Sequence, residues 1–147
     1  MSYPTGIPGS GILVRRFFNG YLHFAVVNDS LKALRLTSGL SSTAPTSQSP
    51  EIYPIRGGSF AICANGTTNG IIWAVQNNGA RSDHDTGAPG VLFAYDATNL
   101  HNELYNSSHA GTRDTLDFAA KFSIPLIANG KVFVAGQTQL VAYGLLP

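Results

Sequence analysis

Charge is scarce in this sequence. Only 12% of its 147 residues are Asp, Glu, Lys or Arg, and nine basic residues nearly balance eight acidic ones. An average globular chain has roughly 25% charged residues. A formal net charge of +1 provides neither the basic footprint of a nucleic-acid-binding protein nor a polybasic patch for a membrane surface. We therefore expect no nucleic-acid and no membrane partner.

Cysteine and long apolar runs are lacking as well. The single cysteine, Cys63, excludes an internal disulfide framework and a cysteine-rich zinc site. No apolar stretch approaches the roughly 20 residues that a membrane-spanning helix requires. The first residues, Met-Ser-Tyr-Pro-Thr-Gly, have neither a charged n-region nor an apolar h-region, so no signal peptide is expected.

Strong helix formers are also few, with three lysines, two glutamates and one methionine. Gly, Asn, Ser and Thr are abundant instead, and between them lie short runs rich in β-branched and aromatic residues. Such runs, bounded by turn residues, predict strands of an all-β protein. They cover residues 12–18, 21–27, 60–64, 71–75, 91–95, 131–135 and 140–145.

Asn-Gly dipeptides mark a repeat in this pattern. Asn19-Gly20 and Asn129-Gly130 each lie directly between two apolar runs, where Asn-Gly favours a type I′ β-hairpin. Asn69-Gly70 opens a similar run, and the three anchors are spaced 50 and 60 residues apart. Each is followed by a Leu-x-Ala-Leu/Tyr segment, at 31–34, 92–95 and 140–143. A period near 50 residues with three or four strands per unit is typical of β-propeller blades.

We therefore expect one all-β domain over residues 1–147, a partial β-propeller of about three four-stranded antiparallel blades. The outer strands are expected near 42–47 and 103–107, and the third copy ends before a fourth strand. An up-and-down sandwich or irregular barrel is the alternative, although neither requires an internal repeat. The expected blades span approximately 11–48, 58–108 and 121–147.

Three segments carry a family resemblance: Val91–Leu100 with Asn102–Tyr105, Ile124–Val134, and Leu140–Pro147. They resemble blades of the quinoprotein-like (PQQ-repeat) propellers, and the chain looks most like the C-terminal three blades of a bacterial member. The resemblance implies an extracytoplasmic location, periplasmic or secreted. The tryptophan that typically closes each repeat is missing, with Tyr105 in that region and Trp73 on a second strand. Since three blades would not enclose a quinone and no adjacent cysteine pair exists, PQQ is assigned to no residue.

Three blades leave two apolar blade faces uncovered. Propellers close at roughly 4–8 blades, because each blade buries its faces between two neighbours. The chain is then either part of a longer protein or a homo-oligomer, and a dimer giving six blades is favoured. A segment from the N-terminus of the same or a neighbouring chain would supply the missing outer strand. The function expected first is a self-assembling, non-catalytic binding or structural module.

A divalent metal site is the main candidate for chemistry. Asp83-His84-Asp85 lies in the polar insertion 76–90, and carboxylate and imidazole groups suit such an ion. Neighbouring side chains of an extended segment point apart, so a solvated loop is the competing interpretation. A channel enzyme is the alternative function, either a metal-dependent lactonase or phosphoesterase-type hydrolase or a quinoprotein-type oxidoreductase. Further candidate ligands flank the second outer strand: His101 and His109.

The remaining candidates each have a structural interpretation. Arg15-Arg16 interrupts the first inner strand, and alternation directs one arginine to each face. One of them would bind an anion in a central channel, or else pair with a carboxylate at an assembly interface. Cys63 fits a buried core thiol, since a reactive thiol would need a histidine nearby. His23 fits a packing position.

Common catalytic motifs are missing. The sequence contains no Gly-x-Ser-x-Gly elbow, no phosphate-binding Gly-Lys-Ser/Thr loop and no His-Glu-x-x-His helix. The two glutamates, Glu51 and Glu103, lie far apart along the chain and suggest no carboxylate pair.

Overall fold

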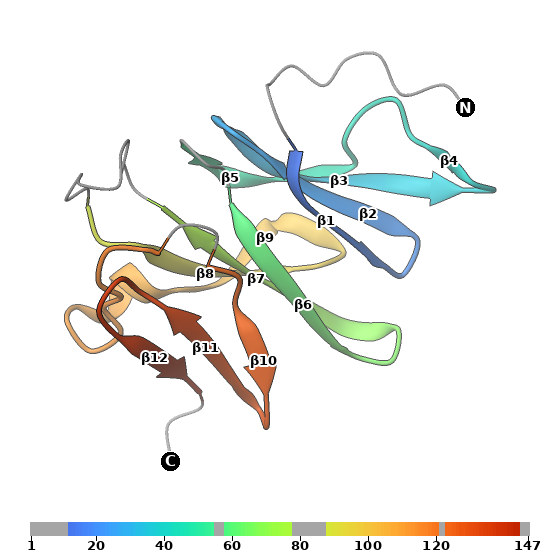
Figure 1. Cartoon of the computed structure of the whole chain (residues 1–147). Helices are drawn as coiled ribbons and strands as arrows, with labels where there is room; N and C mark the ends of the chain where they lie inside the picture. Colours follow the sequence, from blue (N-terminus) through green and yellow to red (C-terminus); the bar gives the residue numbers. More distant parts are fainter. Residues whose placement is uncertain (1–11, 55–57, 78–87, 121–122, 145–147) are drawn as a thin grey trace.

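The structure, a computed structural model, describes residues 12–54, 58–77, 88–120 and 123–144. Over these ranges the chain is all-β, with three antiparallel sheets and a single 3₁₀ turn, η1 (Ser107–Ala110) (Figure 1). This part of the chain contains no helix that could cross a membrane.

The first sheet confirms the first Asn-Gly hairpin. Asn19 (φ 44°) and Gly20 (φ 79°) both have the positive φ of a type I′ turn. The outer strand begins at Ser47 rather than Ser42, because Ser42 Oγ accepts from the Arg35 N–H (3.1 Å) and donates to the Ala44 carbonyl (2.8 Å). The first sheet therefore extends beyond residue 48, where the sequence predicts the end of the first blade. Its strands are β1 (Ile12–Phe18), β2 (Tyr21–Val26), β3 (Asp29–Thr37), β4 (Leu40–Ser41) and β5 (Ser47–Tyr53), with β3 pairing both β4 and β5.

The second sheet corrects one turn of the repeat. Asn65 pairs with Thr68, so the hairpin turns at Gly66 and the next residue, and Asn69-Gly70 lies inside a strand. The strands follow in order, as β6 (Ser59–Asn65), β7 (Thr68–Gln76), β8 (Val91–Asp96) and β9 (Asn99–Asn106).

Gly70 has a packing role. A Cβ at this position would lie 2.3 Å from Cε1 of Phe18, so only glycine lets that ring approach the second sheet so closely. The Gly70 carbonyl also accepts a hydrogen bond from the Ala97 N–H (2.9 Å). The residue therefore belongs to the contact between the first and second sheets rather than to a hairpin turn.

The third sheet confirms the other predicted hairpin. Asn129 (φ 50°) and Gly130 (φ 70°) again have positive φ values. Within the described residues this sheet has three strands, and its last strand lies at the edge. They are β10 (Leu126–Ala128), β11 (Lys131–Ala135) and β12 (Leu140–Tyr143).

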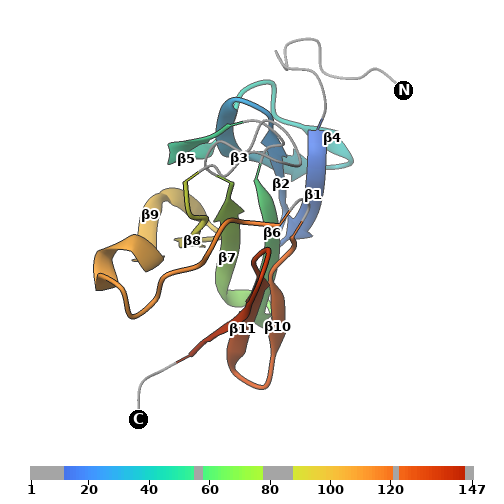
Figure 2. The same ribbon diagram turned by 60° about the vertical axis from the view of Figure 1, so that its left-hand side comes forward.

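The second sheet lies between the other two, with one apolar core on each side. The core shared with the first sheet contains the fully buried Tyr53, Phe60 and Tyr95. The core shared with the third sheet includes Leu92 and Val134. The first strands of the sheets adjoin one another, since β6 contacts both β1 and β10 (Figure 2).

Candidate functional site

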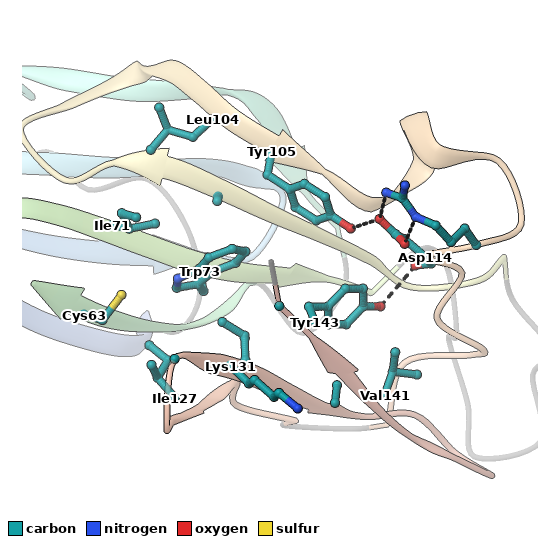
Figure 3. A pocket seen from close by; sticks show the side chains of 16 residues that line it. Cys63, Ile71, Trp73, Leu104, Tyr105, Asp114, Ile127, Lys131, Val141 and Tyr143 are labelled. Atoms are coloured by element: carbon teal, nitrogen blue, oxygen red, sulfur yellow. Dashed lines mark hydrogen bonds and ion pairs between the residues drawn. The ribbon is translucent and has the colours of Figure 1, made fainter. Parts of the chain in front are cut away.

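A pocket of about 760 Å³ lies between the second and third sheets. We call it the seam pocket. One wall comes from β6 to β9, and the other comes from β10 to β12 and the turn between β10 and β11 (Figure 3). Its apolar lining includes Cys63, Ile71, Leu104, Ile127 and Val141.

Three aromatic rings from both sheets cluster at the seam pocket. The ring centroids of Trp73 and Tyr105 are 6.0 Å apart, and those of Tyr105 and Tyr143 are 6.3 Å apart with an edge-on orientation. In the β7–β8–β9 register, Ala94 lies between Trp73 and Tyr105. Because the alanine side chain is small, the two large rings approach each other across it. Such tilted pairs are favoured by the charge distribution of aromatic rings.

A polar network around Asp114 lies at one end of the pocket (Figure 3). The carboxylate of Asp114 accepts hydrogen bonds from Tyr105 Oη (2.6 Å), Arg113 Nε (2.6 Å) and Arg113 Nη2 (2.7 Å). Its backbone carbonyl accepts from Tyr143 Oη (3.2 Å). The hydrogen bonds from Arg113 and Tyr105 lower the pKa of Asp114 to about 2, whereas burial raises the pKa of Tyr143 to about 12. At neutral pH the carboxylate is therefore ionised and the Tyr143 phenol is protonated.

Two further polar groups of the pocket have no such partners. Trp73 Nε1 is buried and has no hydrogen-bond acceptor within the described part of the chain. Lys131 lines the pocket and is exposed, and it forms no ion pair with the residues that the structure describes.

The structure gives definite positions to Cys63 and His23. Cys63 is partly buried and lines the seam pocket together with Ile127, so it is not a fully buried core thiol. His23 is buried, and its Nε2 donates to the Ala97 carbonyl (2.8 Å), which confirms the packing interpretation. Burial lowers the pKa of His23, and the bond to Ala97 only partly opposes this shift.

Of the predicted anion-binding and Asp-His-Asp residues only Arg16 has a described side chain, and it does not line the seam pocket. Arg16 pairs with His23 across β1 and β2 and is exposed, while Arg15 pairs with Phe24. The side chain of Arg15 and the whole of Asp83, His84 and Asp85 lie outside the described residues, so anion and metal binding there stay predictions.

A metal site does not form elsewhere in the described ranges. No three His, Cys, Asp or Glu side chains there are grouped to hold a metal ion. His101 lies within β9 rather than beside it, His109 lies in η1, and both are exposed.

The two glutamates, which lie far apart along the chain, come together in space. Glu51 of β5 accepts a hydrogen bond from Tyr95 Oη, which is itself 3.1 Å from Tyr53 Oη. Burial raises the pKa of Glu103, and the charge and hydrogen bonding of Glu51 raise it further. The two carboxyl groups therefore interact at the contact between the first and second sheets.

The outer sheets present apolar side chains on the faces turned away from the second sheet, which we call the outward faces. On the third sheet, Leu126 pairs with Phe133 and Ala135 pairs with Leu140, and both leucines are exposed (62% and 69%). On the first sheet, Phe17 is 62% exposed. It shares its outward face with a buried cluster of Phe24, Val26 and Leu34.

Comparisons with protein-family models, curated proteins and solved structures find no match to this chain. The resemblance to quinoprotein-like propellers therefore stays an expectation from sequence motifs.

Proposed function

We propose that the chain is a self-assembling, non-catalytic module that forms half of a six-bladed β-propeller-like ring. The observation that carries this proposal is the outward face of the third sheet. Exposed apolar side chains that gather on one face usually mark an interaction site. Leu126 and Leu140 form such a face, opposite the buried Val132 and Val134 of the same sheet.

The composition of β11 supports a neighbour on this face. Along this strand Val132 and Val134 point toward the second sheet and Phe133 and Ala135 point away, so both faces are apolar beyond Lys131, which starts the strand on the outward face. A strand with one solvated face normally alternates apolar and polar residues, whereas a strand covered on both faces is apolar throughout. The third sheet therefore has the character of an internal layer.

The first sheet offers the complementary surface. Its outward face exposes Phe17, whereas Phe24, Val26 and Leu34 beneath it are already buried within the chain. A two-fold axis would place the third sheet of each copy against the first sheet of the other, which closes the ring with two identical contacts. Six sheets lie within the range of roughly 4–8 blades at which propellers close. The adjoining first strands, β1, β6 and β10, would line the axis of that ring.

Light scattering coupled to size-exclusion chromatography tests the assembly. We expect a species of twice the 15.5 kDa chain mass. The double variant Leu126→Lys, Leu140→Lys is expected to elute as a monomer, because four lysines would have to be buried in the closed ring. A monodisperse 15.5 kDa wild-type monomer at every concentration would overturn the proposal.

Leu40→Lys is the matched control. Leu40 is 75% exposed, but it lies on the β3–β4 hairpin rather than on an outward face. This variant should keep the mass of the wild type. Equal loss of assembly in both variants would show that added charge, rather than the outward face, controls association.

A further inference from the structure

The outer edge of the third sheet is open and unprotected. Among the described residues β12 pairs only with β11, so its other edge has no partner strand. An open edge is a template for pairing with another chain, and natural proteins usually block it with charged residues or proline. The outermost strands of the other sheets carry such residues, Pro50 and Glu51 in β5 and Glu103 in β9, whereas β12 consists of Leu, Val, Ala and Tyr. The edge of β12 is therefore suited to receive a further strand.

The turn before β12 fixes which of its backbone groups are free. The Gly136 N–H donates to the Gln139 carbonyl (2.8 Å), so these two residues begin the ladder as a hydrogen-bonded pair. In an antiparallel ladder such pairs alternate with pairs whose N–H and C=O groups point to the opposite edges. Val141 is then bonded to β11, whereas Leu140 and Ala142 direct their N–H and C=O groups to the open edge. A further strand would find two donors and two acceptors there.

The seam pocket lies along the same edge. Val141 and Tyr143 of β12 line one side of it, and Leu104 and Tyr105 of β9 line the other (Figure 3). The outer strands of the first two sheets, β5 and β9, contact each other. The third sheet has no such outer strand within the described ranges, and Leu104 is 55% exposed. A strand added to β12 would direct every second side chain toward β9, and apolar side chains there would match the lining of the pocket.

Lys131 favours an acidic residue on the added strand. It lies opposite Gly144 when the register of β11 and β12 is continued by one residue, and a Cβ on Gly144 would be 3.3 Å from the Lys131 Cγ. Lys131 is exposed and forms no ion pair with any residue that the structure describes. Because Gly144 has no side chain, nothing on β12 separates the lysine from a residue of the added strand on the same face. Residues 1–11 of this chain contain no Asp or Glu, which favours a separate polypeptide as the source of the strand.

We propose that the open edge of β12 binds an extended segment of a partner protein as a fourth, antiparallel strand. The segment has an acidic residue opposite Gly144 and apolar residues opposite Tyr143 and Val141, which gives the pattern acidic–apolar–any–apolar. Backbone hydrogen bonds to β12 hold the strand, and its alternate side chains provide specificity. The apolar side chains enter the seam pocket, and the acidic side chain pairs with Lys131 on the outward face. This goes beyond the proposed assembly, since all of these groups belong to a single chain.

A synthetic peptide, acetyl-Glu-Val-Thr-Val-Thr-amide, tests the proposal on the intact protein by calorimetry. Its third residue would lie opposite Ala142 and donate its N–H to β12, whereas the N–H of its fourth residue would face solvent. N-methylation of the third residue should therefore weaken binding about tenfold, the ratio expected for one lost hydrogen bond. N-methylation of the fourth residue should leave the affinity within about twofold. No saturable binding of the parent peptide at millimolar concentration, or an equal effect of the two methylations, would overturn the proposal.

Charge variants test the acidic residue of the partner. Replacing Glu by Gln in the peptide should weaken binding about threefold, as expected for an exposed ion pair, and Lys131→Gln should abolish this difference. Arg35→Gln removes an exposed cation that packs on Tyr21 of the first sheet, and it should preserve the difference. A difference that survives Lys131→Gln would refute the pairing with Lys131.

A second peptide tests the source of the strand. The peptide of residues 2–9, Ser-Tyr-Pro-Thr-Gly-Ile-Pro-Gly, is expected to bind more weakly than the acidic peptide. Tighter binding of this peptide would show that the first residues of the chain occupy the edge, and it would refute a separate partner.

Discussion

Gly136 allows a sharp test of how the third sheet is held. The residue follows β11, and a Cβ there would lie 1.5 Å from Oδ1 and 2.6 Å from Cγ of Asp117. The Asp117 carboxylate binds the turn toward β12, accepting from Thr138 N (2.8 Å), Thr138 Oγ1 (2.5 Å) and Gln137 N (3.1 Å). Gly136→Ala must therefore displace this carboxylate.

The expected cost follows from the bonds that are lost. Gln137 N keeps its second acceptor, the Phe118 carbonyl at 2.9 Å, whereas both bonds to Thr138 disappear. Hydrogen bonds to a charged group contribute about 1.5–3 kcal/mol each, and the exposed turn places these at the lower end, so the loss is about 3 kcal/mol. At about 2–4 °C per kcal/mol for a chain of this size, the Tm falls by about 6–12 °C.

Urea denaturation of four proteins measures the effect: wild type, Gly136→Ala, Asp117→Ala and the double variant. Asp117→Ala alone should cost a similar amount, because it removes the same bonds. In the double variant the added Cβ no longer meets a carboxylate, so its cost should nearly vanish and the two effects should not add. Gly144→Ala is the control, since a Cβ there meets only the flexible Lys131 Cγ at 3.3 Å. Additive losses, or a neutral Gly136→Ala, would refute this reasoning.

Three further predictions concern the contact between the first and second sheets. Gly70→Ala should lower the free energy of unfolding by about 1–3 kcal/mol through overpacking against Phe18, and Phe18→Leu should recover part of it in urea titrations. Glu103 has a raised pKa, so wild-type stability declines as pH rises above 4.5, its usual value. Glu103→Gln should be more stable than wild type at pH 7 but not at pH 4. Equal stability of the variant and the wild type at both pH values would contradict the pairing with Glu51. His23 has a pKa below 6.5, so its neutral form is lost as pH falls and stability declines below pH 6.5. His23→Gln should show a shallower decline in thermal unfolding between pH 7 and pH 5.

Local signals in the sequence predicted the hairpins well. Asn19-Gly20 and Asn129-Gly130 form the expected turns because both residues need positive φ and nothing nearby competes. Two Asn-Gly pairs, Asn65-Gly66 and Asn69-Gly70, lie close together in the second sheet. Asn69-Gly70, the pair used as an anchor of the repeat, is not the one that turns. The pairing of Asn65 with Thr68 fixes the turn, and Asn69-Gly70 becomes part of β7. Gly70 packs against Phe18 of the first sheet, and this contact between sheets is not visible in the local sequence.

The seam pocket could not be predicted from local sequence signals for the same reason. Trp73, Tyr105 and Tyr143 meet only once the register of β7, β8 and β9 and the docking of the third sheet are known. The contact between Glu51 and Glu103 likewise depends on β5 lying beside β9. Period and turn residues predict strands and their order, whereas side chains from different sheets are brought together by packing.

The two contacts of the second sheet differ in strength, and this sets an order of unfolding. The contact with the first sheet contains Tyr53, Phe60 and Tyr95, all without exposed surface. The contact with the third sheet has fewer buried side chains, and the partly buried Trp73 and Tyr105 complete it. In stacked architectures each layer is stabilised mainly by its neighbours. The third sheet is therefore the layer that detaches first, and its amide hydrogens should exchange with solvent before those of β6 to β8.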